Sequence, residues 1–229
     1  MIITGIVDRI DTRALAREPA VQILSLTLAE PFPFDAGQYL EVLHPDGTAI
    51  PLSIASPPEA LPRLTLHYRS TPGSPEAERM DALLRESAPL TIRGPGGDVR
   101  LGVDDRRPLL LVCGGTGISL ALCLAAAQRL RHPASPVEIL ACADDAADLY
   151  FEDLIPEGTA RTLIADPARD ASNAGLAWLR KRAPQLPADT WVIIAGSPPF
   201  VWAVTDVLTE CGIAADRLAS DVYAWAPRP

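Results

Sequence analysis

The sequence predicts two joined architectures: an N-terminal antiparallel Greek-key β-barrel over residues 1–104, and an α/β half over residues 105–229. In the second half, helices should flank a parallel five-stranded sheet. Three observations support this fold class. Short alternating strands precede residue 105, apolar strands alternate with helices after it, and two of those strands end in glycine-rich turns.

The first half shows the period-two pattern of half-buried strands. Val21–Leu28 and Leu64–Tyr68 alternate apolar with polar residues, and turn sequences such as Pro45-Asp46-Gly47 separate the runs. One helix is expected over Pro75–Ser87. The expected strands are Ile2–Asp11, Val21–Ala29, Gln38–His44, Ile50–Ala55, Arg63–Tyr68 and Leu90–Arg93. Regularly spaced short strands with a single helix favour a barrel.

The second half changes to a strand–helix rhythm. The unbroken apolar run Leu109–Val112 is typical of a strand that is buried on both faces, as in a parallel sheet. The pattern locates four of the five strands of this sheet, at Leu109–Cys113, Val137–Cys142, Arg161–Ala165 and Trp191–Ala195. The expected helices run from Ile118 to Arg131, near Asp148–Leu154, over Ala174–Arg182, and from Phe200 to Cys211.

Two of these strands end in turns that could hold a ligand. Gly114-Gly115-Thr116-Gly117 follows the first strand and Gly196-Ser197-Pro198 follows the last. Both turns should lie at the carboxyl edge of the sheet, where ligands bind in open α/β folds. Glycine lets a ligand approach the backbone, and a helix start favours phosphate. The spacing is neither GxGxxG nor a Walker sequence, so ordinary ligand-free connections remain an alternative.

Composition excludes several classes of partner. The chain has 229 residues, 48% of them apolar, which is typical of a soluble globular protein. A net charge of −9 argues against nucleic acid or an anionic membrane as partner. No signal peptide is evident, and the apolar helix around Ile118–Ala127 is too short to span a bilayer. We therefore expect a cytoplasmic protein.

No metal site is expected. The four cysteines (Cys113, Cys123, Cys142 and Cys211) lie far apart in apolar segments, which favours buried free thiols over ligands or disulfides. The three histidines show no paired spacing. The sequence therefore predicts neither a zinc centre nor an iron–sulfur cluster within this chain.

The order of these features resembles the ferredoxin–NADP reductase superfamily, most closely its compact NAD(P)H:flavin reductase branch. The segment Pro51-Leu52-Ser53-Ile54-Ala55-Ser56 is similar to the family's flavin-binding segment. Gly94-Pro95-Gly96-Gly97 resembles the turn that closes the barrel. The stretch from Asp216 to Trp225 looks like the terminal segment whose aromatic side chains lie against the flavin side of the cleft.

The resemblance implies a set of site residues. Leu52, Ser53, Ile54 and Ala55 would contact the flavin. Gly114, Gly115, Thr116, Gly117, Gly196, Ser197 and Pro198 would contact the nicotinamide nucleotide, and Tyr223 and Trp225 the flavin side of the cleft. Ser53, beside flavin N5 and the C4 carbonyl, and Thr116 are the candidate catalytic residues. The alternatives are a strand end for Ser53, a helix cap for Thr116, and plain core packing for Tyr223 and Trp225.

Departures from the family pattern point to weak flavin binding. Ile50 stands where relatives have an arginine that grips the flavin phosphate, and Leu52 where they have an aromatic residue. Loss of a charge-assisted contact forfeits about 1.5–3 kcal/mol. The segment Pro72-Gly73-Ser74 also matches the pyrophosphate-binding element poorly. FAD or FMN should therefore be held loosely.

The expected nucleotide is NADH rather than NADPH. The strand Val137–Cys142 runs into Asp144 and Asp145, and no arginine follows it to meet a 2′-phosphate. Asp144 is the candidate partner of the ribose hydroxyls, because a carboxylate accepts their hydrogen bonds and repels a phosphate. The alternative is a solvated acidic loop that caps the next helix.

These expectations lead to one function and two alternatives. The chain should transfer a hydride from NADH to a loosely bound flavin, with the reduced flavin serving a flavin-dependent or electron-accepting protein. Because Ile50 and Leu52 depart from the pattern, the first alternative is a reductase-like regulatory subunit without catalysis. The second is an electron-transfer subunit with bound flavin that works beside a cluster-bearing partner.

Overall fold

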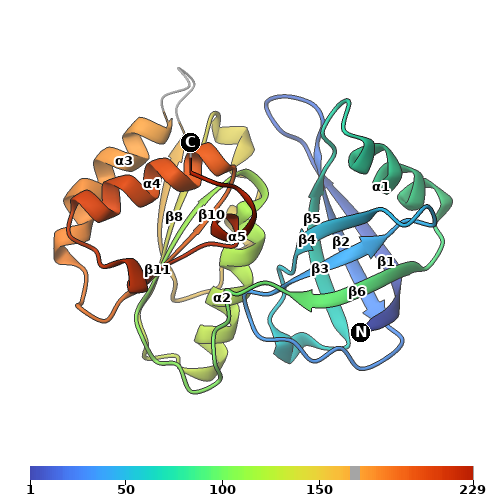
Figure 1. Ribbon diagram of the computed structural model, residues 1–229, viewed down its shortest axis with the longest axis horizontal. Helices are drawn as coiled ribbons and strands as arrows, with labels where there is room; N and C mark the ends of the chain where they lie inside the picture. Colours follow the sequence, from blue (N-terminus) through green and yellow to red (C-terminus); the bar gives the residue numbers. More distant parts are fainter. Residues whose placement is uncertain (166–170, 229) are drawn as a thin grey trace.

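A computed structural model describes residues 1–165 and 171–228 of the chain. Figure 1 shows two halves side by side, with the β-barrel on the right and the α/β half on the left. A six-stranded antiparallel sheet makes the first half and a five-stranded parallel sheet the second. This arrangement confirms the predicted fold class. The boundary between residues 104 and 105 stays a prediction.

The antiparallel sheet has the strand order β4-β3-β6-β1-β2-β5. Its strands are β1 (Ile2–Arg13), β2 (Val21–Leu28), β3 (Tyr39–Leu43), β4 (Ala49–Ser53), β5 (Arg63–Arg69) and β6 (Leu90–Gly96). The two edge strands, β4 and β5, form no regular ladder with each other; an isolated bridge between Ile54 and Leu66 connects them just beyond the end of β4. The sheet therefore curls into a barrel that is nearly, but not fully, closed.

A helix covers one end of the barrel. Helix α1 (Pro75–Glu86) buries Met80 and Leu83, and Ser74 caps it by accepting a hydrogen bond from the Ala77 N–H group. Tyr68 of β5 reaches this helix, because its hydroxyl donates to the Ala77 carbonyl at 3.0 Å. Proline at the first helical position explains why the helix begins at Pro75.

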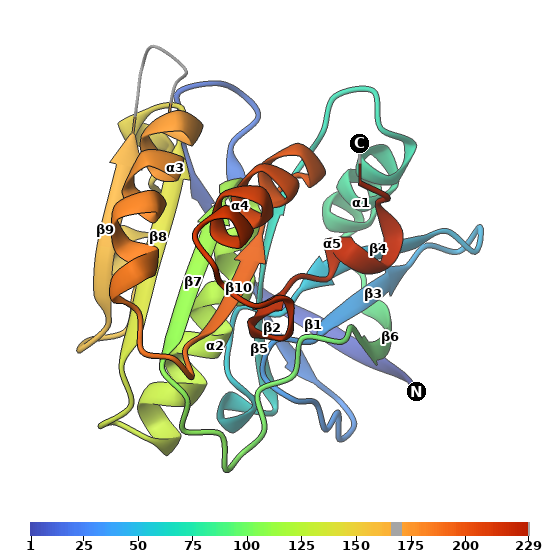
Figure 2. The same cartoon turned by 60° about the vertical axis from the view of Figure 1, so that its left-hand side comes forward.

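The parallel sheet has the order β11-β10-β7-β8-β9. Its strands are β7 (Leu109–Gly114), β8 (Val137–Ala143), β9 (Ala160–Ala165), β10 (Trp191–Ala195) and β11 (Leu218–Ala219). Its helices are α2 (Ile118–Arg131), α3 (Ala171–Arg182), α4 (Pro198–Glu210) and α5 (Val222–Trp225). Helix α2 lies between this sheet and the barrel, whereas α3 and α4 cover the other face (Figures 1 and 2).

The core follows this layering. Leu109 and Leu111 belong to one apolar cluster with α2 and the barrel interior, whereas Leu110 and Val112 belong to a second cluster with α3 and α4. Alternate residues of β7 thus face opposite layers, so both faces of the strand must be apolar. This explains the unbroken apolar run in the sequence.

The predicted helix over Asp148–Leu154 is wrong. Two 3-10 turns, η3 (Ala146–Asp148) and η4 (Glu152–Leu154), flank the buried residues Tyr150 and Phe151. The backbone hydrogen bonds here join residues three apart, such as the Leu149 N–H to the Ala146 carbonyl and the Leu154 N–H to the Phe151 carbonyl, so the segment forms two short turns in place of an α-helix. The sequence pattern also did not resolve β11 and α5, which are two and four residues long.

The remaining short helices are η1 (Pro58–Ala60), η2 (Gly115–Gly117), η5 (Ala183–Gln185) and η6 (Ala215–Arg217). Across residues 1–165 and 171–228, no helix combines the length and apolarity that a membrane crossing requires. All four cysteines are free thiols. Cys113, Cys123 and Cys142 are buried as predicted, whereas Cys211 is partly exposed.

Candidate functional site

The two glycine-rich turns lie in direct contact. A Cβ atom added at Gly117 would lie 2.6 Å from the carbonyl carbon of Ala195 and 2.9 Å from the Gly196 nitrogen. A Cβ at Gly196 would lie 3.5 Å from the Gly114 nitrogen. Strands β7 and β10 are parallel neighbours that pair up to Cys113 and Ala195, so both turns leave the same sheet edge. The structure thus brings together the two turns that the sequence singled out.

The turn after β7 leaves room for a ligand. Gly115 has a φ of +57°, and nothing lies within 4 Å of a Cβ built on it. Helix α2 begins after Gly117 with no side-chain cap, so Thr116 does not take the capping role that was its alternative. The first N–H groups of this helix are therefore available to a ligand from the side of Gly115.

The second turn offers a similar helix start. Ser197 is the N-cap residue of α4 and makes no side-chain capping hydrogen bond, and Pro198 is the first helical residue. Ser197 is exposed, whereas Gly196 is half-buried against the Phe200 ring. An exposed hydroxyl at a helix start is suited to binding a polar part of a nucleotide.

Strand β4 presents its two faces very differently. Ile50 is buried in the barrel core, and Leu52 packs against the same core opposite Leu40. Ser53 lies on the outer face, directly opposite Tyr39 of β3. Ile50 and Leu52, the two residues that depart from the family pattern, thus face the core. A ligand outside the barrel would contact Ser53 instead.

The residues after Ser53 are buried. Ile54 has no exposed surface and Ala55 retains 7% of its own. The Ala55 N–H donates to the Thr65 carbonyl at 2.8 Å, so this segment is fixed to β5. Strand β5 in turn contacts the Gly115–Gly117 turn. The segment after Ser53 and the Gly115–Gly117 turn thus both contact β5.

The start of helix α1, where the resemblance placed a pyrophosphate-binding element, already holds a carboxylate. The Ser74 hydroxyl donates to Oε2 of Glu76 at 2.8 Å and accepts from the Ala77 N–H group at 3.3 Å. A backbone hydrogen bond and the Ser74 contact lower the pKa of Glu76. Arg79 on the same helix is paired with Asp46 at 2.5 Å. These contacts leave no free positive charge for a phosphate at this helix start.

The acidic loop after β8 contains three carboxylates, and two of them make hydrogen bonds that hold the fold together. Asp145 caps η3 by accepting from the Ala147 N–H at 2.9 Å, as the capping alternative expected. Asp148 accepts from the Ala16 N–H at 2.9 Å. Asp144 is exposed. Among the described residues no hydrogen bond is found to Asp144, so it stays the candidate partner of a ribose.

The hairpin between β1 and β2 reaches across from the barrel to this loop. Besides the Ala16 contact, Arg13 binds Asp153 through two hydrogen bonds of 3.3 and 3.1 Å. Arg69 of β5 fixes the same hairpin to the barrel by donating hydrogen bonds to the carbonyls of Pro19 and Arg17. These contacts between the hairpin and the loop leave no local pattern in the sequence, because the bonded residues lie 132 and 140 positions apart.

A buried polar pair also joins the two halves. His67 of β5 lies 3.0 Å from the Tyr150 hydroxyl, and both side chains are buried. Burial, with a smaller contribution from Arg13, lowers the pKa of His67 to about 4. The imidazole is therefore neutral at pH 7 and serves as a structural hydrogen-bond partner rather than a charged ligand.

The C-terminal segment bridges the halves on the other side. Asp221 accepts a hydrogen bond from the Asp98 N–H at 3.3 Å, and burial raises the pKa of its carboxyl group. The Tyr223 hydroxyl lies 2.7 Å from the Thr205 hydroxyl, and its ring centroid lies 5.0 Å from that of Trp202. Tyr223 thus packs on α4. Trp225 is 66% exposed.

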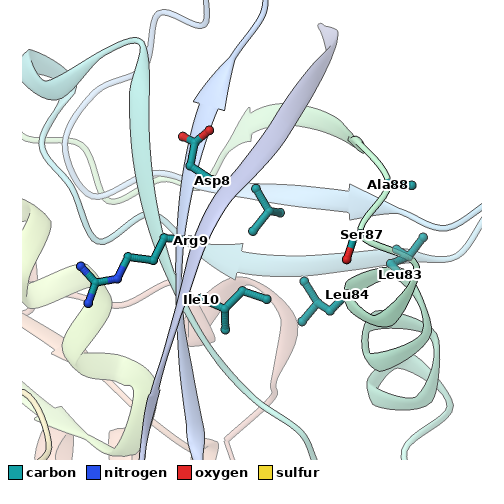
Figure 3. A pocket seen from close by; sticks show the side chains of 8 residues that line it. Asp8, Arg9, Ile10, Leu83, Leu84, Ser87 and Ala88 are labelled. Carbon is teal, nitrogen blue, oxygen red and sulfur yellow. The ribbon is translucent and has the colours of Figure 1, made fainter.

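The barrel has a separate small hollow, shown in Figure 3, between β1 and the end of α1. It measures about 120 Å³, and Ile10 faces Leu84 across it while Asp8 and Arg9 point away. The hollow lies beside the register shift between Val7 and Arg9. A bulge that lifts the strand from the helix accounts for the hollow, and its size does not suit a dinucleotide.

Within the part of the chain that the structure describes, no three metal-ligating side chains come together. The two glycine turns are the part of the candidate site that the structure brings into contact, and Ser53 and the acidic loop stay candidate members of it. Tyr39, which sequence reasoning missed, faces the same side as Ser53. The alternation along Tyr39–Leu43 could have placed it on the outer face, but no spacing linked it to Ser53.

Comparison with known proteins identifies relatives of this chain. The chain is 30% identical over 223 residues to the terephthalate 1,2-dioxygenase reductase component 2 of a Comamonas species, covering 91% of this chain and 66% of the relative. It is 33% identical over 132 residues to an NAD(P)H-flavin reductase of Vibrio harveyi, which covers 56% of each protein. No family model matches the sequence.

The fold agrees with these relatives. A cytochrome P450 reductase of Amycolatopsis superposes with a TM-score of 0.77 and 25% identity, over 96% of this chain and 69% of that one. A phthalate dioxygenase reductase, at 16% identity, shares the fold with a TM-score of 0.75. The chain spans about two thirds of the length of the dioxygenase reductase components that it matches. It belongs to the ferredoxin–NADP reductase superfamily.

Proposed function

We propose that this chain is an oxidoreductase that transfers a hydride from NADH to a weakly held flavin. The observation that carries the proposal is the contact between the turns at Gly114–Gly117 and Gly196–Pro198. The first of these turns also contacts β5, the strand that is bridged to Ile54 next to Ser53. Reductase relatives with this fold include one named as an NAD(P)H-flavin reductase. An acceptor protein, such as a flavin-dependent or electron-accepting enzyme, would use the product.

The bound cofactors supply the hydride chemistry itself, and the protein supplies orientation and electrostatics. The open side of Gly115 admits a flat ring close to the backbone, and the uncapped start of α2 favours a negative group. The hydroxyl of Ser53 can donate to the N5–C4 carbonyl edge of an isoalloxazine, which takes up electron density on reduction. Thr116, half-buried in the turn, would position the nicotinamide.

We expect the chain to purify largely free of flavin and to bind riboflavin, FMN and FAD with dissociation constants within about threefold of each other. Ile50 lies in the core and Glu76 occupies the start of α1, so neither position supplies a positive charge that would bind the phosphate of FMN or FAD. A charge-assisted phosphate contact would instead separate the ligands by roughly 10- to 100-fold. Quenching of flavin fluorescence measures the three constants. Submicromolar FAD with far weaker riboflavin would show that another cation binds the phosphate.

We expect NADH to be preferred over NADPH by about tenfold in kcat/KM. Asp144 is exposed after β8, where a 2′-phosphate would meet like charge. Parallel assays with saturating FMN measure the ratio of kcat/KM for NADH to that for NADPH. The substitution Asp144→Ser should bring this ratio closer to one. Asp145 is unsuitable for this test because it caps η3. A higher kcat/KM for NADPH would place the adenosine elsewhere.

A reductase-like subunit without catalysis is the second candidate, favoured by the inward positions of Ile50 and Leu52. The spectrum of the purified chain and its NADH oxidation separate the candidates. Colourless protein that oxidises NADH only with added flavin supports the proposed enzyme. Colourless protein that stays inactive with flavin supports the second candidate. Yellow protein that retains flavin through gel filtration supports an electron-transfer subunit.

A further inference from the structure

One segment of the α/β half makes three separate contacts with the barrel. This bridging segment, residues 148–153, follows β8 in the loop that begins with Asp144. Three of its side chains form hydrogen bonds with the barrel, and the bonded pairs are Asp148 with Ala16, Tyr150 with His67, and Asp153 with Arg13. Two of the barrel partners lie at the β1–β2 hairpin, which reaches toward the α/β half (Figure 1), and the third lies in β5. The bridging segment is therefore fixed to two different parts of the barrel.

The contact between Tyr150 and His67 is buried. Tyr150 keeps 9% of its surface exposed and His67 keeps 4%. The centroids of the two rings lie 5.6 Å apart, and Phe151 packs edge-on against Tyr150 at 5.2 Å. Because a buried hydrogen bond leaves its second partner unpaired when the first is removed, it fixes the direction of both side chains. Tyr150 thus holds the bridging segment to β5 at one defined position.

The contact between Arg13 and Asp153 lies nearer the surface. The Arg13 guanidinium donates to both carboxylate oxygens of Asp153, at 3.3 and 3.1 Å, and to Asp11 of its own strand at 3.0 Å. A bidentate pair of this kind fixes orientation as well as distance. The Asp153 side chain is 59% exposed, so the pair contributes little to stability. Its effect is to resist rotation of the bridging segment about the Tyr150 contact.

The strand that holds Tyr150 also holds the segment after Ser53. His67 lies in β5 two residues beyond Thr65, whose carbonyl accepts the hydrogen bond from the Ala55 N–H group. On the other side, the bridging segment follows β8, the parallel neighbour of β7 and its glycine turn. The hydrogen bond between Tyr150 and His67 therefore connects the half expected to hold the nucleotide with the half expected to hold the flavin.

The relative placement of the two halves matters for the proposed reaction. Hydride transfer needs the reacting atoms about 3–3.5 Å apart, and a misplacement of about 1 Å costs on the order of 100-fold in rate. The glycine turns belong to the α/β half and Ser53 to the barrel. Each ligand can thus bind its own half correctly and still be misaligned with the other ligand.

We propose that Tyr150 and Arg13 are positioning residues for hydride transfer, which hold the two halves at the separation at which the nicotinamide and the flavin react. The inference rests on the proposed function. Neither side chain has to contact a ligand for this role, because Tyr150 acts through His67 and Arg13 acts through Asp153. Loss of both contacts should leave the two binding sites intact and lower the rate of the step between them.

The test is steady-state flavin reduction by the wild-type chain, Tyr150→Phe, and the double variant Tyr150→Phe/Arg13→Gln. We expect kcat to fall about threefold in the single variant and about tenfold in the double variant, because the ligands are misaligned. The KM for NADH and the dissociation constant for riboflavin, measured by fluorescence quenching, should stay within about twofold of the wild-type values.

Two variants within the barrel provide matched controls. Tyr68→Phe removes a buried tyrosine hydroxyl whose partners, Ala77 and Asp81, both belong to α1. Arg79→Gln breaks an ion pair with Asp46, also within the barrel. Both controls remove the same kind of interaction without separating the halves, so kcat should stay at the wild-type value.

Thermal melts of each variant separate positioning from folding. Tyr150→Phe and Tyr68→Phe should melt at similar temperatures, and only Tyr150→Phe should turn over slowly. If the double variant melts early, Tyr150→Phe alone is assayed at a temperature at which it is folded. Wild-type kcat in the folded variants, a raised KM with normal kcat, or an equal loss of kcat in Tyr68→Phe would overturn this inference and leave the proposed function intact. A wild-type chain that does not reduce flavin with NADH would overturn the proposed function, and this inference with it.

Discussion

Gly117→Ala is expected to destabilise the chain and to weaken NADH binding together. The new methyl group would lie 2.6 Å from the backbone of Ala195, and backbone cannot rotate away as a side chain can. Forcing atoms into such a contact costs about 1–3 kcal/mol or more. For a chain of this size that corresponds to a melting temperature lower by roughly 3–10 °C. Separation of the two turns should also raise the KM for NADH.

Gly102→Ala is the matched control for this substitution. Nothing lies within 4 Å of a Cβ at Gly102, and its φ is outside the left-handed region. Its effect should stay within about 0.5 kcal/mol, as for most surface changes. A Gly117→Ala variant that melts and binds NADH like Gly102→Ala would mean that the two turns do not touch.

Ser53→Ala is expected to lower the turnover number by on the order of 100-fold without a comparable loss of stability. The loss of one preorganised donor to developing charge has effects of that size. Ser53 is half-buried at the end of β4 on the outer face of the barrel, so removal of its hydroxyl leaves no core cavity. Steady-state flavin reduction measured beside a thermal melt provides the comparison.

Ser53→Thr provides the rescue, because it retains a hydroxyl at the same position. We expect it to recover much of the turnover that Ser53→Ala loses. Unchanged turnover and flavin KM in Ser53→Ala, with an unchanged melt, would remove Ser53 from the site. An early melt with normal turnover would assign it a structural role at the strand end instead.

The sequence was sufficient for the fold because its signals were local. The unbroken run Leu109–Val112 and the two glycine turns predicted a parallel sheet, and the structure contains it. The failure over Asp148–Leu154 has a tertiary cause. Tyr150 and Phe151 are buried where the two halves meet, and His67 and Arg13 of the barrel hold this segment in place. No periodicity along the chain encodes such partners.

The candidate site was predictable in part for the same reason. The pairing of the glycine turns follows from topology, because parallel neighbours end at one edge. The inward direction of Ile50 and Leu52 depends on strand register, since a shift of one residue exchanges the faces of a strand. The same register places Tyr39 beside Ser53, a relation between two strands that sequence spacing alone does not show.

The most direct test of the proposed function is an anaerobic reduction of free flavin. The purified chain, in catalytic amount, is mixed with NADH and excess FMN, and the absorbance of oxidised flavin is followed before the mixture is passed through an ultrafilter. We predict that all the FMN is bleached at the expense of an equal amount of NADH, and that reduced flavin appears in the filtrate. Bleaching no faster than in the protein-free mixture, or reduction limited to flavin that the filter retains, would contradict the proposal.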